Sequence, residues 1–273
     1  MTLRISKDTQ LCISMSARPS NIGTRFHNYL YEALGLDFVY KAFAPSDIES
    51  AVAGIRSLGI RGAAVSMPFK QQVIPFLDEV DETAAVINAV NTIVNDDGYL
   101  TGFNTDFIAV RALLAHRRLD PDSTIAVLGS GGMARAVIAA VADLGYRNRF
   151  VVARNIERGE EMAEQYDANF MTELANVKPD VIINATPVGM AGGVDAHRLP
   201  LDVSLIPGAR LVFDVVAVPA ETLLIQTARV SRVPVVVGTE VMTLQAVEQF
   251  ELYTGVRPAA ELVAQAAEFS RAE

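Results

Sequence analysis

The second half of the chain alternates apolar stretches of strand length with amphipathic stretches of helix length. A strand, a helix and a further strand in succession form a parallel pair, because parallel strands need a long crossover connection. This alternation predicts an α/β fold with a doubly wound, Rossmann-type sheet covered by helices on both faces. The expected strands are residues 124–128, 150–153, 181–184, 211–214 and 234–237, and the expected helices between them are residues 133–144 and 156–166.

A glycine-rich turn joins the first of these strands to its helix. It consists of Gly129, Ser130, Gly131, Gly132, Met133 and Ala134. Glycines at such a place let backbone amides approach a pyrophosphate at the positive end of a helix. The same turn also occurs in α/β proteins without a nucleotide, but its place between a strand and a helix favours a dinucleotide.

The end of the next strand indicates which dinucleotide. Arg154 and Asn155 stand where an NAD enzyme usually places an acidic residue for the ribose 2′-hydroxyl, and Arg158 follows one turn later. Because a guanidinium pairs bidentately with a phosphate, these residues favour NADP as the cofactor. The alternative is two ordinary exposed arginines that pair with Glu157 or Glu160.

A polar loop, Asn184–Met190, follows a later strand and contains Thr186 and Pro187. Ligands of doubly wound sheets bind at the carboxyl ends of the strands, so we expect this loop to line the nicotinamide-ribose part of the cofactor site. Taken alone, the loop is also compatible with a simple polar turn.

The first part of the chain mixes strands and helices as well. Strands are expected at 11–14, 38–42 and 62–65, and a hairpin at 90–101. Helices are expected at 26–34 and 106–115. Two further helices are expected, one opened by a capping box at 46–49 and closed at Gly59, and one that begins at Pro68 and carries Lys70. Residues 119–123 resemble a linker. The last two helices, at 241–253 and 259–269, are expected to pack back on the first domain. Residues 1–105 with 243–273 should therefore form a substrate-binding, catalytic domain, and residues 106–242 the NADP-binding domain.

Composition excludes several classes of protein. The chain has 273 residues, 51 % of them hydrophobic, which is enough for two cores. Its net charge of −9 argues against nucleic-acid binding. No stretch approaches the ~20 apolar residues of a membrane helix, and the N-terminus carries no apolar signal segment. A single cysteine, Cys12, is typical of the cytoplasm, and with only three separated histidines no metal site is expected.

The remaining polar residues occur in short motifs. They are Ser66–Lys70, Ala89–Thr92, Asn104–Asp106 and, near the C-terminus, Gln245. No spacing rule alone brings these motifs together, and Lys70 with Asp106 would otherwise be a surface ion pair of small worth. In this order, and followed by the glycine turn, the motifs resemble the shikimate/quinate dehydrogenase family over nearly the whole chain.

The resemblance implies a role for each of these residues. Lys70 and Asp106 match the catalytic pair, and Ser66, Asn91 and Gln245 match contacts to the substrate. Val215, Gly238 and Met242 would join the glycine turn and Arg154 in binding NADP. The implied reaction interconverts a secondary ring alcohol and a ketone of a small cyclic hydroxy acid such as shikimate. Lys70 would give or take the proton of the reacting hydroxyl group, and Asp106 would orient Lys70. The protein is expected to be a monomer or a homodimer.

Three positions depart from the family pattern. Counting back from His27, Asn21 and Gly23 replace two serines that would hold the substrate's carboxylate, and Ala217 stands where a tyrosine is expected. These changes indicate the divergent, shikimate dehydrogenase-like branch of the family. They leave open quinate, aminoshikimate or another ring alcohol as the substrate. They also leave open a protein of another class, a catalytically weak NADP-binding sensor.

Overall fold

The chain divides into two compact units, Met1–Thr105 with Thr243–Glu273 and Asp106–Met242. The computed structural model describes residues 5–272. Both crossings between the units lie inside helices, α4 (Thr105–His116) and α8 (Gly238–Thr254). Each unit is built around its own six-stranded sheet.

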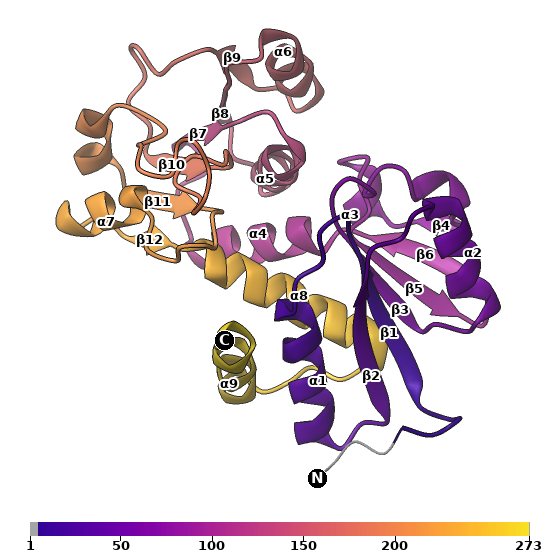
Figure 1. Cartoon of the computed structure of the whole chain (residues 1–273). Coiled ribbons are helices and arrows are strands. Elements are labelled where there is room, and N and C mark those ends of the chain that lie inside the picture. Colours follow the sequence, from indigo (N-terminus) through magenta and orange to yellow (C-terminus); the bar gives the residue numbers. More distant parts are fainter. Residues whose placement is uncertain (1–4, 273) are drawn as a thin grey trace. The chain divides into compact units, whose positions relative to one another are not determined.

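The sheet of the first unit is mixed. Its strand order is β2-β1-β3-β5-β6-β4, with β5 antiparallel to both β3 and β6 (Figure 1). The strands are β1 (Gln10–Met15), β2 (Phe38–Phe43), β3 (Gly62–Val65), β4 (Glu79–Val80), β5 (Thr92–Asp96) and β6 (Tyr99–Phe103). The expected hairpin is present, because Asp97 and Gly98 adopt φ angles of 53° and 93° and so form a tight turn between β5 and β6.

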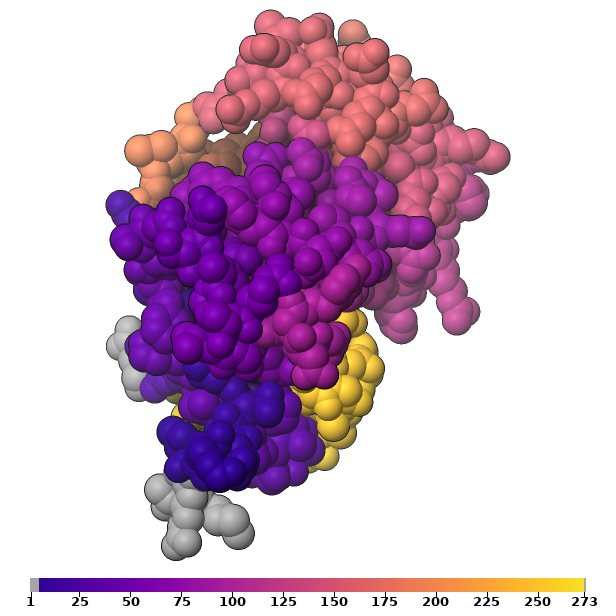
Figure 2. Space-filling model, turned by 90° about the vertical axis from the view of Figure 1, so that its right-hand side faces the viewer, coloured from indigo at the N-terminus to yellow at the C-terminus, as the bar shows by residue number. Residues whose placement is uncertain are grey.

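Helices cover both faces of this sheet because its buried side chains alternate. Cys12 faces α1 (Ile22–Leu34), α8 and α9 (Ala260–Arg271), while Ile13 faces α2 (Ile48–Ser57) and α3 (Glu82–Ala85). The expectation that the C-terminal helices pack back on the first domain is confirmed. In Figure 1, α9 lies beside α1, and Figure 2 shows the yellow C-terminal segment against the purple surface of the same unit.

Three local expectations are wrong. Lys70 lies in a run of turns, because its carbonyl accepts from Val90 N and only the short 3₁₀ helix η1 (Ile74–Phe76) follows. The second helix is capped by Asp47, whose carboxylate accepts from Ser50 N at 2.7 Å, and not by Ser46. Residues 119–123 are no linker, since they belong to the second unit, where Pro121 O accepts from Arg147 N.

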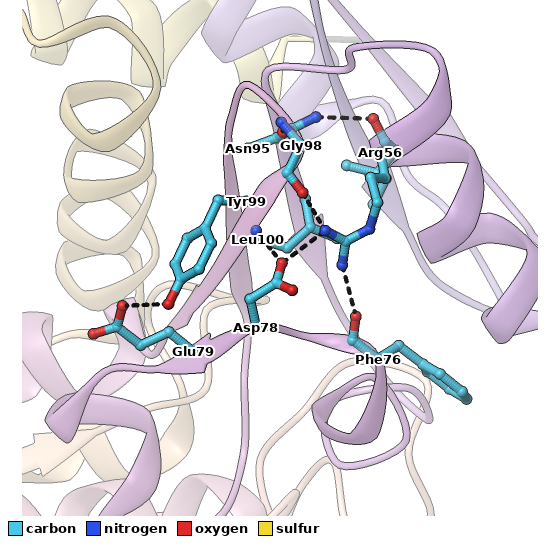
Figure 3. A network of polar contacts seen from close by, with 9 residues as sticks. Arg56, Phe76, Asp78, Glu79, Asn95, Gly98, Tyr99 and Leu100 are labelled. Atoms are coloured by element: carbon cyan, nitrogen blue, oxygen red, sulfur yellow. Dashed lines mark hydrogen bonds and ion pairs between the residues drawn. The ribbon is translucent and has the colours of Figure 1, made fainter.

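A polar network ties α2 to the edge of the first sheet (Figure 3). Arg56 Nη1 donates to Asp78 Oδ2 at 2.7 Å, and Leu100 N donates to the same oxygen at 2.7 Å. Arg56 Nη2 also reaches Phe76 O at 3.4 Å, at the end of η1. The pKa of Asp78 lies below its usual range. The hydrogen bond from the Leu100 amide is the larger cause, and the hydrogen bond from Arg56 is the smaller one. The network therefore anchors the far end of the segment that carries Lys70.

The second unit contains an entirely parallel sheet in the order β12-β11-β10-β7-β8-β9. Its strands are β7 (Thr124–Leu128), β8 (Asn148–Val152), β9 (Asn169–Met171), β10 (Val181–Asn184), β11 (Leu211–Asp214) and β12 (Val235–Val236). The main helices after these strands are α5 (Gly132–Asp143), α6 (Ile156–Gln165) and α7 (Leu223–Val230), and η2 (Val203–Gly208) precedes β11. This is the Rossmann order, so the predicted doubly wound fold is confirmed.

Gly62 in β3 lies so close to a neighbouring side chain that no Cβ atom fits there. A Cβ atom there would overlap the ring of buried Tyr253, whereas one at Gly54 in α2 would meet nothing within 4 Å. We expect Gly62→Ala to destabilise the protein by about 1–3 kcal/mol through overpacking. The matched control Gly54→Ala should stabilise it by up to about 1 kcal/mol. Denaturant unfolding followed by circular dichroism measures both, and equal effects would contradict the packing described.

Candidate functional site

The glycine turn after β7 forms an open cradle at the start of α5. Gly129 has a φ of +116°, and a Cβ atom there would lie 3.1 Å from Ala185 O and strain the backbone. Gly131 is the N-cap residue of α5, and no side chain caps this helix end. Gly131 and Gly132 leave open space where a side chain would stand. The free amides and the helix dipole therefore suit an anion such as a pyrophosphate.

A pocket of about 650 Å³ opens at this turn within the second unit. Seven of the predicted cofactor residues line it, namely Gly129, Ser130, Gly131, Arg154, Asn155, Thr186 and Pro187. Among residues 5–272, neither Arg154 nor Arg158 forms an ion pair, so the alternative pairing with Glu157 or Glu160 is not what the structure shows. Asn155 instead caps α6, where its Oδ1 accepts from Arg158 N at 3.0 Å.

The other predicted cofactor residues lie outside the lining of this pocket. Gly132, Met133 and Ala134 form the first turn of α5. Gly238 begins α8, and a Cβ atom there would overlap the backbone of Val216 and lie 2.6 Å from Val215 O. Met242 is the last residue of the second unit. Only glycine allows the close approach of α8 to the end of β11.

A buried polar network fixes the loops that follow β10 and β11. Asn184 Nδ2 donates to Asp214 Oδ1 at 2.9 Å, and Thr222 Oγ1 donates to Asp214 Oδ2 at 2.6 Å. Asn184 Oδ1 in turn accepts from Thr186 Oγ1 at 2.6 Å. Burial raises the pKa of Asp214, although the hydrogen bonds from Thr222, Val216 and Asn184 oppose the rise. The network holds Thr186 at the pocket wall.

Several pocket residues were not identified from the sequence. They are Thr172, Asp195, Arg198, Leu199 and Pro200, together with apolar residues at the strand ends. The last four follow the polar loop after β10, where no motif or periodicity marks a binding role. Only the folded path of that loop brings them back to the pocket.

In the first unit, Asn91 is the predicted substrate residue whose side chain the protein holds with several hydrogen bonds. Its side chain is buried, and its Oδ1 accepts from Thr92 Oγ1 at 2.8 Å, Thr105 N at 2.8 Å and Thr105 Oγ1 at 3.1 Å. Its Nδ2 faces Gln245 Oε1 at 3.5 Å. The amide oxygen is thus fully used by the protein, and the amide nitrogen points to Gln245. The structure brings these two predicted residues together.

Ser66, Lys70 and Asp106 occupy three different settings. Ser66 is exposed directly after β3, and its amide donates to Met15 O at 2.9 Å. Lys70 is half-buried in the turns that follow. Asp106 is buried in the first turn of α4, where the helix dipole favours a negative charge. Its neighbour Thr105, the last residue of the first unit before the chain enters the second, donates from its amide to Asn91 Oδ1.

Two of the three departures from the family pattern, Asn21 and Gly23, lie at the start of α1. Asn21 is exposed at the N-cap position without a side-chain capping bond. Gly23 does not have a positive φ, and a Cβ atom there would lie 3.7 Å from the Tyr40 ring, an ordinary contact. His27 stacks on Tyr40 with the ring centroids 4.4 Å apart, and burial lowers the pKa of His27 to about 3. His27 is therefore neutral near pH 7 and supplies no charge in place of the missing hydroxyls.

Comparisons with known proteins identify the family of the chain. Residues 19–93 match the family model of the shikimate dehydrogenase substrate binding domain. Residues 124–205 match a model described as NADP oxidoreductase coenzyme F420-dependent. A shikimate dehydrogenase-like protein of Haemophilus influenzae is 49 % identical over 267 residues, which is 98 % of each chain. The chain belongs to the shikimate dehydrogenase family.

Other relatives extend the comparison. A shikimate dehydrogenase (NADP(+)) of Chlorobaculum tepidum is 37 % identical over 262 residues, or 87 % of each chain. The solved shikimate 5-dehydrogenase of Thermus thermophilus, in complex with NADP(H) and shikimate, superposes with a TM-score of 0.86 at 26 % identity, covering 96 % of this chain and 99 % of that one. The predicted family, the Rossmann-type NADP-binding domain and the NADP-dependent oxidoreductase class are thereby confirmed.

Two further properties follow from the described residues. No helix in residues 5–272 is long and apolar enough to cross a membrane. Within the same range, no group of three or more histidine, cysteine, aspartate or glutamate side chains is arranged to hold a metal ion.

Arg154 should determine the choice of cofactor. Arg154→Asp places a carboxylate at the pocket wall, where it would repel a 2′-phosphate as well as remove a partner for it. We expect the affinity for NADP+ to fall far more than that for NAD+, measured by calorimetry. Arg210→Asp is the matched control, because it makes the same charge change at an exposed residue before the amino end of β11. An equal loss for both cofactors in Arg154→Asp would make Arg154 a structural residue.

Proposed function

We propose that this protein is an NADP-dependent oxidoreductase that interconverts a secondary ring alcohol and a ketone in a small cyclic hydroxy acid, shikimate or a close analogue. The observation that carries the proposal is the prearranged amide of Asn91. Its oxygen is held by Thr92 and Thr105, which leaves its nitrogen beside Gln245 to donate to a substrate oxygen. Polar groups that are already fixed in this way orient a polyhydroxylated substrate, which an apolar cleft could not do.

The chain's own residues would divide the work as follows. Ser66, Asn91 and Gln245 would hold the hydroxyl groups or the carboxylate of the substrate. NADP, when bound, supplies the hydride chemistry. Lys70 would give or take the proton of the reacting oxygen, and Asp106 would orient Lys70 and balance its charge.

The cofactor would be held by the cradle of the second unit. The amides of the glycine turn would bind the pyrophosphate, and Arg154, supported by Asn155 and Arg158, would bind the 2′-phosphate. Thr186, Pro187, Val215, Gly238 and Met242 would contact the nicotinamide half. The open space at Gly131 and Gly132 supports this fit.

Lys70→Ala should abolish most turnover. A general acid or base typically contributes about 10²–10⁴-fold to the rate, so we expect a loss in that range with little change in NADP+ affinity. Lys41→Ala in β2 is the control, because Lys41 is an exposed lysine of the same unit. Steady-state absorbance of NADPH and calorimetric binding measure the two quantities. A loss below about tenfold would remove Lys70 from the proton transfer.

A second candidate substrate class is a neutral ring or sugar ketone. Gly23 and Asn21 offer no pair of hydroxyls, and buried His27 adds no charge, so a carboxylate would be held weakly. One solved relative is named for a neutral sugar ketone, a 5-ketofructose reductase (25 % identity, TM-score 0.86), whereas another, a quinate dehydrogenase in complex with NAD (27 % identity, TM-score 0.85), is named for a ring acid. A screen of acids and neutral polyols with NADP+ and NAD+ separates these classes. A non-catalytic sensor would bind NADPH and turn over none of them.

Restoring the hydroxyls should improve the use of shikimate. A hydrogen bond to a charged group contributes about 1.5–3 kcal/mol, so Asn21→Ser with Gly23→Ser should lower the Michaelis constant for shikimate by at least about tenfold. The position of Gly23 tolerates a Cβ atom, and the Michaelis constant for NADP+ should not change. Asn21→Ala with Gly23→Ala is the control for the backbone. A folded serine variant without any gain would show that this protein holds its substrate through other residues.

A further inference from the structure

The loop after β10 returns to the cofactor pocket and brings a second arginine to its wall. Arg198 lines the same pocket as Arg154 and the glycine turn, and Asp195 lies beside it in the lining. The pocket thus contains two guanidinium groups and one carboxylate. Of these two arginines, only Arg154 stands in the segment after β8 where the sequence predicts the 2′-phosphate contacts.

Arg198 and Asp195 pair with each other within the loop. Arg198 Nη1 lies 3.0 Å from Asp195 Oδ1, and the two side chains are 74 % and 21 % exposed. An exposed pair three residues apart contributes little to stability, because water and salt screen it. The pair can therefore be exchanged at small cost for a stronger partner of Arg198.

The two residues differ in how firmly the backbone holds them. The carbonyl of Asp195 accepts from Gly189 N and from Arg198 N, both at 3.1 Å, so the carboxylate is attached to a fixed turn. Arg198 carries its charge at the end of a long side chain that is mostly in solvent. The guanidinium can turn away from Asp195 while the loop keeps its path.

We propose that Arg198 is a further arginine for the 2′-phosphate of NADP, in addition to Arg154 and Arg158, and that it leaves Asp195 for this phosphate when the cofactor binds. The inference rests on the proposed NADP-dependent function. A phosphate monoester carries close to two negative charges and three acceptor oxygens, so it is a stronger partner for a guanidinium than one carboxylate. Arg154, which has no ion pair among the described residues, would hold the phosphate from the end of β8.

Asp195 then has an effect opposite to that of Arg198. It holds the guanidinium at the pocket wall before the cofactor arrives, and it competes with the phosphate for that guanidinium. Once Arg198 has turned, the carboxylate also repels the phosphate. Removing its charge should tighten binding, whereas removing the charge of Arg198 should weaken it. A pair that served only to stabilise the loop would give both substitutions the same sign.

The test is calorimetric binding to the full chain with four probes: NADP+, NAD+, adenosine 2′,5′-bisphosphate and ADP. Arg198→Gln should weaken the two ligands with a 2′-phosphate about tenfold and leave the other two within about twofold. Asp195→Asn should tighten the same two ligands by roughly threefold. The matched controls are Arg147→Gln and Asp122→Asn, a pair joined at 2.7 Å with exposures of 69 % and 64 % that lies outside the pocket lining. They should change none of the four affinities.

Three outcomes would overturn the inference while leaving the proposed function intact. They are normal wild-type binding with no effect of Arg198→Gln, equal weakening of all four ligands, and weakening of NADP+ by both Arg198→Gln and Asp195→Asn. Equal weakening would mean that Arg198 contacts the adenine or pyrophosphate, and a shared sign would mean that the pair is structural. A wild-type chain that bound none of the four probes would overturn the proposed function together with the inference.

Discussion

The hydrogen bonds received by the buried amide oxygen of Asn91 are the interaction on which the candidate substrate site depends. They come from Thr92 in the same segment and from Thr105 at the start of α4. Gln249 Nε2 adds a bond to Thr92 Oγ1 at 3.0 Å from α8. Three parts of the first unit that are far apart in the chain are therefore joined at one point. A buried polar group left without such partners would destabilise the unit, so the bonds also fix the direction of the Asn91 side chain.

The positively charged groups at the pocket of the second unit act over a short range, although the chain as a whole is negatively charged. The chain has a formal net charge of −9, yet the proposed ligand is an anion. Backbone amides at the start of α5 and the guanidinium groups of Arg154 and Arg198 supply the positive potential at the pocket. Because charges separated by more than about 8–10 Å are screened at physiological salt, these nearby groups outweigh the distant carboxylates.

The sequence predicted five of the six strands of the parallel sheet because each of these is a short apolar run, most of them bounded by polar or glycine residues, but it did not predict the three-residue strand β9. The glycine turn was equally clear, since glycine is required where φ is positive and where Ala185 approaches. The segment of Lys70 was misjudged because its carbonyl bonds to Val90, a partner that no local pattern reveals. Arg198 was missed for a similar reason, since only the path of the loop after β10 brings it to the pocket. The roles of Lys70 and Asp106 came from the family resemblance and not from spacing.

The first unit is assembled from the two ends of the chain, and this arrangement constrains the order in which the protein can form during synthesis. Phe250 and Tyr253 of α8 and Ala266 of α9 complete the core over Cys12 and Tyr31. The ribosome makes these residues after those of the second unit, so they also emerge after it. The second unit can therefore fold while one face of the first unit's sheet is covered by α1 alone and is still partly open to water. A chain that stopped before α8 would keep the glycine turn of the cofactor cradle but leave that face covered by α1 alone, and the exposed apolar surface would make it a target for chaperones and proteases.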